Sequence, residues 1–178
     1  GEVTGIWDLN GNVSEWVGGY RVKDGEIQIL PNNDAADADN SQAADSTKWR
    51  AIMPDGSLVD PGTPGTLKWD YTADPGTVSA EKPFRLNTVL EFQQTVEAPY
   101  GSVAFQSLTA ADGVNVPEIL KALALFPADS GDHGSDRIYM RNIGERLAYR
   151  GGNWYNASNA GVFIAYGSDP RSGSSAHI

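Results

Sequence analysis

The sequence predicts a mixed α+β fold with short, mostly antiparallel strands, few helices and long ordered loops. Twenty Gly and ten Pro among 178 residues place turns at frequent intervals, which argues against a helical bundle. Five Trp residues supply large apolar side chains to a fold with little regular structure. A chain of this length can hold one domain with a sizeable core, or one domain with a long insertion. We therefore expect a single domain over residues 1–178.

The first half of the chain alternates strand-like runs with polar loops. Residues 1–30 form compact structure, in which Glu26–Leu30 alternates like a half-buried strand and stops at Pro31. Residues 32–46 are acidic and contain no large apolar group, which predicts a surface loop. Further strands separated by Pro-Gly turns are predicted at Lys48–Met53, Leu67–Tyr71 and Ser102–Leu108.

The second half contains the one helix that the sequence predicts with a clear pattern, Pro117–Phe126. Pro117 suits the first turn, and Ile119, Leu120 and Leu123 share an apolar face. A polar loop follows at 129–136. Strands are then expected at Arg137–Arg141 and Arg146–Arg150, on either side of a turn at Asn142–Gly144, and residues 151–178 are rich in Gly, Ser and Asn.

Charge and composition exclude several classes of function. The formal net charge of −10 disfavours a nucleic-acid partner, because phosphate backbones are held by clustered Lys and Arg. No apolar run approaches membrane-spanning length, so direct membrane insertion is not expected. The absence of cysteine excludes disulfides, thiolate nucleophiles and cysteine-based metal sites.

The remaining candidate catalytic and metal-binding residues are few. Of the two histidines, His133 lies in a Gly/Asp/Ser loop and is interpreted as a solvated loop residue rather than a base. The aspartates of residues 32–46 could hold calcium, but the run lacks the Gly and closing Glu of an EF-hand loop, so an ordinary acidic loop is favoured. We expect no cofactor and no catalytic residue.

Two separated blocks carry a family resemblance. Residues 5–17 read Gly-Ile-Trp-Asp-Leu-Asn-Gly-Asn-Val-Ser-Glu-Trp-Val, and residues 150–154 read Arg-Gly-Gly-Asn-Trp. In this order they resemble two signature blocks of the formylglycine-generating-enzyme (sulfatase-modifying factor) superfamily. The resemblance implies the C-type-lectin-like fold of that superfamily, with residues 31–140 insertion-rich. It also implies that residues 1–20 and 146–164 share one core that buries Trp7, Trp16, Trp154 and Phe163.

The chemistry of that superfamily does not carry over to this chain. Its oxygen-dependent enzymes have catalytic cysteines just after the second block, where this chain has Tyr155 and Asn156. Its iron-dependent sulfoxide synthases need a histidine cluster that is also lacking. The resemblance therefore implies a scaffold that is not an enzyme. An oxidoreductase of the formylglycine-generating type and a purely structural virion domain are the alternatives.

The last segment resembles a narrower subgroup. Residues 150–178 are similar to the variable region of target proteins of diversity-generating retroelements, in which Asn-Ala-Gly-Val-Phe follows the Arg-Gly-Gly block. Asn159–Phe163 and the terminal Ile178 match that pattern. Adenine-directed mutation of Asn codons yields Tyr, Ser, Asp, Gly, Ala, His and Ile but not Lys, Glu, Gln, Met or Trp, and residues 155–178 contain none of the latter five.

The resemblance implies a hypervariable ligand-binding surface on this segment. Tyr gives amphipathic contact area at low entropy cost, whereas Ser, Gly and Asp give adaptable polar contacts. We expect one exposed patch with Tyr155 and Tyr166 as anchors, held from beneath by Arg150–Gly152, Trp154 and Ala160–Phe163. The partner would be a protein or glycan on a host or target cell, and the protein would belong to a phage tail or bacterial surface. The predicted ligand-binding residues are Tyr155, Ile164, Tyr166, Ser168, Asp169, Gly173, Ser175, Ala176 and His177.

Overall fold

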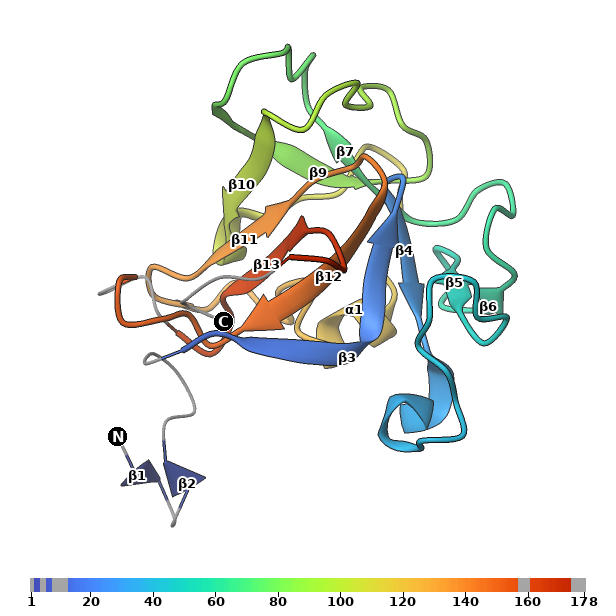
Figure 1. Cartoon of the computed structure of the whole chain (residues 1–178). Helices are drawn as coiled ribbons and strands as arrows, with labels where there is room; N and C mark the ends of the chain where they lie inside the picture. The colour runs from blue at the N-terminus through green and yellow to red at the C-terminus, as the bar shows by residue number, and fades with distance from the viewer. Residues whose placement is uncertain (1, 4–5, 8–12, 157–160, 174–178) are drawn as a thin grey trace.

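A computed structural model describes residues 2–3, 6–7, 13–156 and 161–173, and these residues form a mostly β structure with few helices (Figure 1). This confirms the mixed α+β expectation. One sheet of 11 strands dominates the described part, and its main path runs β6-β5-β4-β3-β12-β13-β11-β10-β8. Strand β7 joins this sheet through β4 and pairs in turn with β9.

The elements have the following bounds. The strands are β1 (Glu2–Val3), β2 (Ile6–Trp7), β3 (Glu15–Lys23), β4 (Glu26–Ile29), β5 (Arg50–Ile52), β6 (Leu58–Val59), β7 (Lys68–Tyr71), β8 (Glu81–Lys82), β9 (Phe84–Asn87), β10 (Tyr100–Ala104), β11 (Arg137–Met140), β12 (Glu145–Arg150) and β13 (Ala165–Asp169). The helices are the 3₁₀ turns η1 (Pro31–Ala36) and η2 (Phe105–Ser107) and the α-helix α1 (Glu118–Ala122).

The two sequence blocks meet in the centre of the sheet. Strand β3 pairs antiparallel with β12, so that Val17 lies opposite Ala148 and Trp16 lies opposite Tyr149. Within the predicted ranges 1–20 and 146–164, the residues of β3 and β12 therefore lie side by side in one sheet. The earlier part of the first block lies largely outside the described residues.

Strand β13 lies between β12 and β11, which are consecutive in the chain. It pairs antiparallel with β12 and parallel with β11, and the turn at Asn142–Gly144 therefore connects strands that do not pair with each other (Figure 1). This insertion places the last described strand of the chain at the middle of the sheet. Any side chain on the outward face of β13 consequently has neighbours on both sides.

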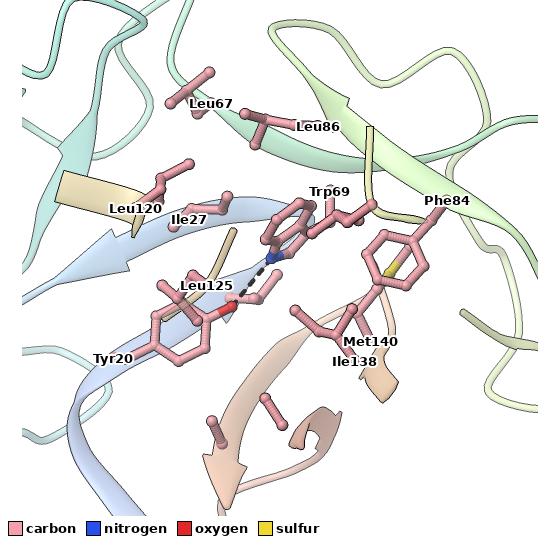
Figure 2. Packing of buried hydrophobic residues seen from close by; sticks show 14 of the residues in the cluster. Tyr20, Ile27, Leu67, Trp69, Phe84, Leu86, Leu120, Leu125, Ile138 and Met140 are labelled. Carbon is pink, nitrogen blue, oxygen red and sulfur yellow. Dashed lines mark hydrogen bonds between the residues drawn. The ribbon is translucent and has the colours of Figure 1, made fainter. Parts of the chain in front are cut away.

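The core lies on one face of the sheet and draws mainly on residues 31–140. Trp69, Tyr71, Phe84 and Leu86 are almost fully buried, and Trp69 donates a hydrogen bond from its indole Nε1 to the hydroxyl of Tyr20 over 3.1 Å (Figure 2). The segment expected to be insertion-rich thus supplies strands β5 to β11 and much of the apolar packing. Residues 31–140 are therefore integral to the sheet.

Three elements differ from the sequence-based expectations. All four residues of β4 are buried, rather than half of them, because Arg21 covers Gln28 and the segment with Gly62 and Thr66 covers Glu26 through hydrogen bonds on the second face. The run at 102–108 is a strand only to Ala104 and then turns into η2. Helix α1 is shorter than predicted, since the chain takes a positive φ of 50° at Ala124.

The acidic segment is a surface loop, as predicted. Residues 32–46 begin within η1 and are mostly exposed. Gln42 accepts a hydrogen bond from the backbone N–H of Gly19, and the carbonyl of Ala43 accepts one from the indole of buried Trp49. The loop is thus fastened to β3 through polar contacts, although it has almost no apolar area to bury.

Candidate functional site

A row of aromatic side chains crosses the sheet on the face opposite the core. Successive residues of a strand point to opposite faces, and in β11 Ile138 and Met140 are buried whereas Tyr139 between them is half-buried. Five adjacent strands, β3, β12, β13, β11 and β10, each contribute one ring. We call this set the aromatic row, and its members are Trp16, Tyr149, Tyr166, Tyr139 and Tyr100.

Strand register aligns the rings. Tyr166 lies directly opposite Tyr149 in the β12–β13 pair and opposite Tyr139 in the β11–β13 pair. Its ring centroid is 4.4 Å from that of Tyr139 with 1° between the planes, and 4.7 Å from that of Tyr149 with 13° between the planes. Trp16 meets Tyr149 edge-on at 5.4 Å, and Tyr100 is tilted against Tyr139 at 6.5 Å.

The stacking decides what the row presents to a ligand. Side chains of a strand stand roughly perpendicular to the sheet, and the middle rings face one another along it. Their faces are therefore covered by neighbours, and the hydroxyl-bearing edges point outward. The surface is a line of hydrogen-bonding phenol groups over apolar rings, which suits recognition of a ligand with both polar and apolar groups.

Neighbouring polar groups engage several of these hydroxyls. The amide Nδ2 of Asn156 donates to the hydroxyl of Tyr166 over 2.9 Å. Burial raises the pKa of Tyr166 to about 12. Burial, and then a hydrogen bond to Asp169, also raises the pKa of Tyr149. These phenols stay protonated at neutral pH and can both donate and accept hydrogen bonds.

An open hollow with a volume of about 370 Å³ lies over the row. Arg141 borders it, with its guanidinium 6.0 Å from the ring centroid of Tyr100 and with Nη1 donating to the carbonyl of Ser168. The hollow combines one cation, two carboxylates and four phenols. Its lining residues are Glu81, Tyr100, Tyr139, Arg141, Tyr149, Tyr166, Ser168 and Asp169.

Three of the predicted ligand-binding residues line this hollow, namely Tyr166, Ser168 and Asp169. Tyr155 is 77% exposed and lies in the turn at 153–156, which Asn156 fastens to Tyr166. Gly173 is half-buried and close to Asp169, since a Cβ at Gly173 would lie 3.4 Å from the Cβ of Asp169. Tyr166, Ser168 and Asp169 thus lie on β13, Gly173 lies close to its end, and Tyr155 lies in a turn that is hydrogen-bonded to Tyr166. Ser175, Ala176 and His177 lie outside the described residues.

The expectation of exposure was wrong for two residues. Ile164 is fully buried, because its apolar side chain turns inward ahead of β13. Ser168 is 8% exposed, although it still borders the hollow. Ile164 therefore belongs with the supporting residues and not with the surface.

The predicted burial of two tryptophans was also wrong. Trp16 is 40% exposed because it stands on the outward face of β3 within the aromatic row. Trp154 is 65% exposed and packs edge-on against Tyr155 in the turn at 153–156, so it cannot support the patch from beneath. Phe163 is half-buried and stacks on Phe105, and the side chain of Trp7 lies outside the described residues.

Arg150 does support the site. It donates from Nη2 to the carbonyls of Leu123 and Ala124, both at 3.0 Å, and so joins the end of β12 to the chain leaving α1. Gly152 is buried with a φ of 64°, a conformation that favours glycine. The Arg-Gly-Gly block thus fixes how the chain leaves β12 before the exposed turn.

Sequence reasoning missed the other tyrosines of the row, Tyr100, Tyr139 and Tyr149, and placed Trp16 in the core. A usable signal was present for two of them. Ile138-Tyr139-Met140 and Ala148-Tyr149-Arg150 place a tyrosine at the alternate position of strands that were predicted. What was missing was the strand order, which brings both tyrosines beside Tyr166.

His133 also differs from its interpretation as a solvated residue. Its side chain is only 9% exposed, and its ring meets Phe105 and Phe163 at 5.2 Å and 4.9 Å. Asp129 lies 3.9 Å from its Nε2. The histidine packs as part of an aromatic cluster beneath the residue 161–164 turn, away from the hollow's lining residues.

Within the described ranges no group of three His, Cys, Asp or Glu residues is arranged to hold a metal ion, and no helix there is long and apolar enough to cross a membrane. No protein-family model matches the chain, and no curated protein is significantly similar to it.

Proposed function

We propose that this chain is a ligand-binding protein that displays a diversified surface on a C-type-lectin-like scaffold of the formylglycine-generating-enzyme type. Its partner would be a protein or glycan on a host or target cell. This chain itself would be part of a phage tail or a bacterial surface. The resemblance of residues 5–17 and 150–178 supports this proposal. The antiparallel pairing of β3 with β12, which joins these two blocks, is consistent with it.

One observation carries the proposal. Strand β13, which lies within the segment that resembles a variable region, occupies the centre of the aromatic row and contributes Tyr166, Ser168 and Asp169 to the open hollow. Replacements at outward positions of such a strand alter the surface, while the buried neighbours Ala165 and Gly167 keep the backbone in place. A binding surface needs this separation between replaceable contacts and a fixed frame.

The composition of the surface also favours recognition over catalysis. Tyrosines with Ser, Asp and Gly are the residues that antibody paratopes use for amphipathic contacts and adaptable hydrogen bonds. Exposed Trp16 at one end of the row, together with exposed Trp154 and Tyr155 in the turn at 153–156, adds apolar contact area. The alternative oxidoreductase function would need cysteine thiols, and the sequence has none.

Binding to intact cells tests this proposal directly. The biotinylated protein would be applied to a panel of intact bacteria and measured by flow cytometry, and we expect binding to some strains. The double variant Tyr155→Ala/Tyr166→Ser should lose at least about tenfold in affinity, as expected when anchors are truncated. Val78→Ala/Val89→Ala, which alters exposed apolar residues outside the row, serves as the control.

Two pretreatments then identify the ligand. Protease digestion of the cells would abolish binding to a protein, whereas periodate oxidation would abolish binding to a glycan. Retention of full binding by Tyr155→Ala/Tyr166→Ser would show that the row is not the site.

The diversification itself is tested in the flanking DNA. It should contain a near-duplicate of the coding segment for residues 150–178, with Asn codons at the differing positions, beside a reverse-transcriptase gene.

A further inference from the structure

We propose that Tyr166 fills a ring-sized slot between Tyr139 and Tyr149, and that a small residue at position 166 opens this slot to a phenol-type ring of a ligand. The residue at position 166 would thus decide whether the surface presents only the edges of stacked rings or an open slot that can take a ligand ring. The physical claim concerns the slot alone, and only its biological use rests on the proposed function.

The geometry defines a slot one ring wide. Tyr166 is parallel to both neighbours, with its centroid 4.4 Å from that of Tyr139 and 4.7 Å from that of Tyr149. Both separations are within the range of stacked aromatic pairs. Removal of the middle ring would leave two nearly parallel walls separated by the space of one flat ring.

The walls do not depend on the Tyr166 side chain for their position. Tyr139 and Tyr149 stand on β11 and β12, which hydrogen-bond through their backbones to β13 on either side. On the side away from Tyr166, Tyr149 packs edge-on against Trp16, and Tyr139 packs against the tilted ring of Tyr100. These contacts oppose collapse of the walls into the space that a smaller residue would leave.

The chemistry of the open end selects the ligand. Asn156 donates from Nδ2 to the hydroxyl of Tyr166 over 2.9 Å, and this amide would lose its partner in a small variant. A ligand ring that carries a hydroxyl can accept the same hydrogen bond, whereas a plain hydrocarbon ring cannot. The slot therefore favours phenols, including the tyrosine side chain of a protein ligand, over benzene-like rings.

The residues accessible at position 166 include members of both classes that this proposal requires. Mutation of the adenines of an Asn codon yields Tyr, which closes the slot, and also Ser, Gly, Ala and Asp, which leave it open. A single replacement at 166 would therefore change the shape of the surface as well as its composition.

Small phenols test the slot without any knowledge of the natural partner. We would titrate p-cresol into Tyr166→Gly and follow the thermal midpoint and the saturable shifts of Tyr139 and Tyr149 ring signals by NMR. At about ten times Kd the Tm should rise by roughly 3–6 °C. Toluene should bind at least about fivefold more weakly, and Asn156→Ala in the same background should remove this preference.

Wild-type protein, with the slot filled, and Tyr155→Gly, which removes an exposed ring outside the stack, are the matched controls and should show no saturable effect. An equal response in either control, or no response in Tyr166→Gly, would overturn the proposal. Glycine weakens strands, so Tyr166→Ala is the second variant. Failure of both variants to fold would also overturn it, because the walls would then depend on Tyr166. Binding of p-cresol without any binding to cells would retain the slot and reject the proposed function.

Discussion

Arg171 and Glu145 form a bidentate ion pair, in which Arg171 donates from Nε and Nη2 to the two carboxylate oxygens of Glu145, each over 2.9 Å. The pair ties the chain just after β13 to the first residue of β12. Glu145 also accepts a 2.7 Å hydrogen bond from Nη1 of Arg21, whose side chain is only 4% exposed. These contacts hold the pKa of Glu145 below its usual value, with the bond from Arg171 as the largest cause.

Loss of the carboxylate should cost more than loss of Arg171. Glu145→Gln would leave the buried guanidinium of Arg21 without its counter-charge, and we expect it to lower the free energy of unfolding by about 2–3 kcal/mol. Arg171→Ala should cost about 0.5–1 kcal/mol, because that side chain is 37% exposed and solvent weakens its attraction. Urea unfolding measures both, with Glu91→Gln at an exposed ion pair as control. Equal losses for Glu145→Gln and Arg171→Ala would contradict this ranking.

The two tryptophans Trp69 and Trp16 should differ sharply in their contribution to stability. Trp69 is fully buried, meets Phe84 edge-on and donates to Tyr20, so Trp69→Ala should cost about 3–5 kcal/mol. Trp16 was expected to be buried, but its side chain is 40% exposed, so Trp16→Ala should cost only about 1 kcal/mol. Denaturant unfolding of the two variants compares them directly, and a larger loss at Trp16 would be incompatible with this packing.

The protein should lose stability at alkaline pH through its buried tyrosines. Burial raises the pKa of Tyr20 to about 12 and also raises that of Tyr71. The unfolded chain releases these protons near pH 10, so their contribution is complete below pH 10 and is lost as pH rises toward 12. We expect the free energy of unfolding to fall by about 1.4 kcal/mol per pH unit for each such tyrosine. Tyr20→Phe should make the decline between pH 10 and 12 shallower in urea unfolding, and an unchanged slope would refute this assignment.

Asn142 should be essential to the turn between β11 and β12. It is fully buried, donates from Nδ2 to the carbonyl of Phe92 over 3.0 Å and accepts the backbone N–H of Gln94 over 2.9 Å. Asn142→Ala would leave both backbone groups unpaired, at an expected cost of about 2–4 kcal/mol. Exposed Asn115→Ala should cost less than about 0.5 kcal/mol by thermal or urea unfolding. Similar values for the two variants would show that these hydrogen bonds are replaced by water.

Local patterns were sufficient to predict where several elements lie. Leu67–Tyr71 and Arg137–Arg141 were expected as strands and coincide closely with β7 and β11. The turn at Asn142–Gly144 and the exposed acidic loop at 32–46 were also predicted. These features depend on alternation and on turn-forming residues, which act over a few neighbouring positions. The expected half-burial of β4 was wrong because its polar side chains are covered by groups distant in sequence, such as Thr66 over Glu26.

The candidate site was predicted only in part for the same reason. Tyr166, Ser168 and Asp169 were identified from the resemblance of residues 150–178, and they do line the hollow. Tyr139 and Tyr149 were not, because nothing near them in sequence indicates that β13 inserts between β11 and β12.

By itself, the sequence determined the mixed composition of elements, the acidic net charge and the Gly-, Ser- and Asn-rich composition of residues 151–178. Only the tertiary structure decided that this segment forms a central strand, that Trp16 faces outward and that Ile164 faces inward. The physical reason is the range of the interactions. Alternation and turn preferences are local, whereas the order of strands in a sheet, and hence which rings stack, follows from backbone pairing between residues far apart in the chain.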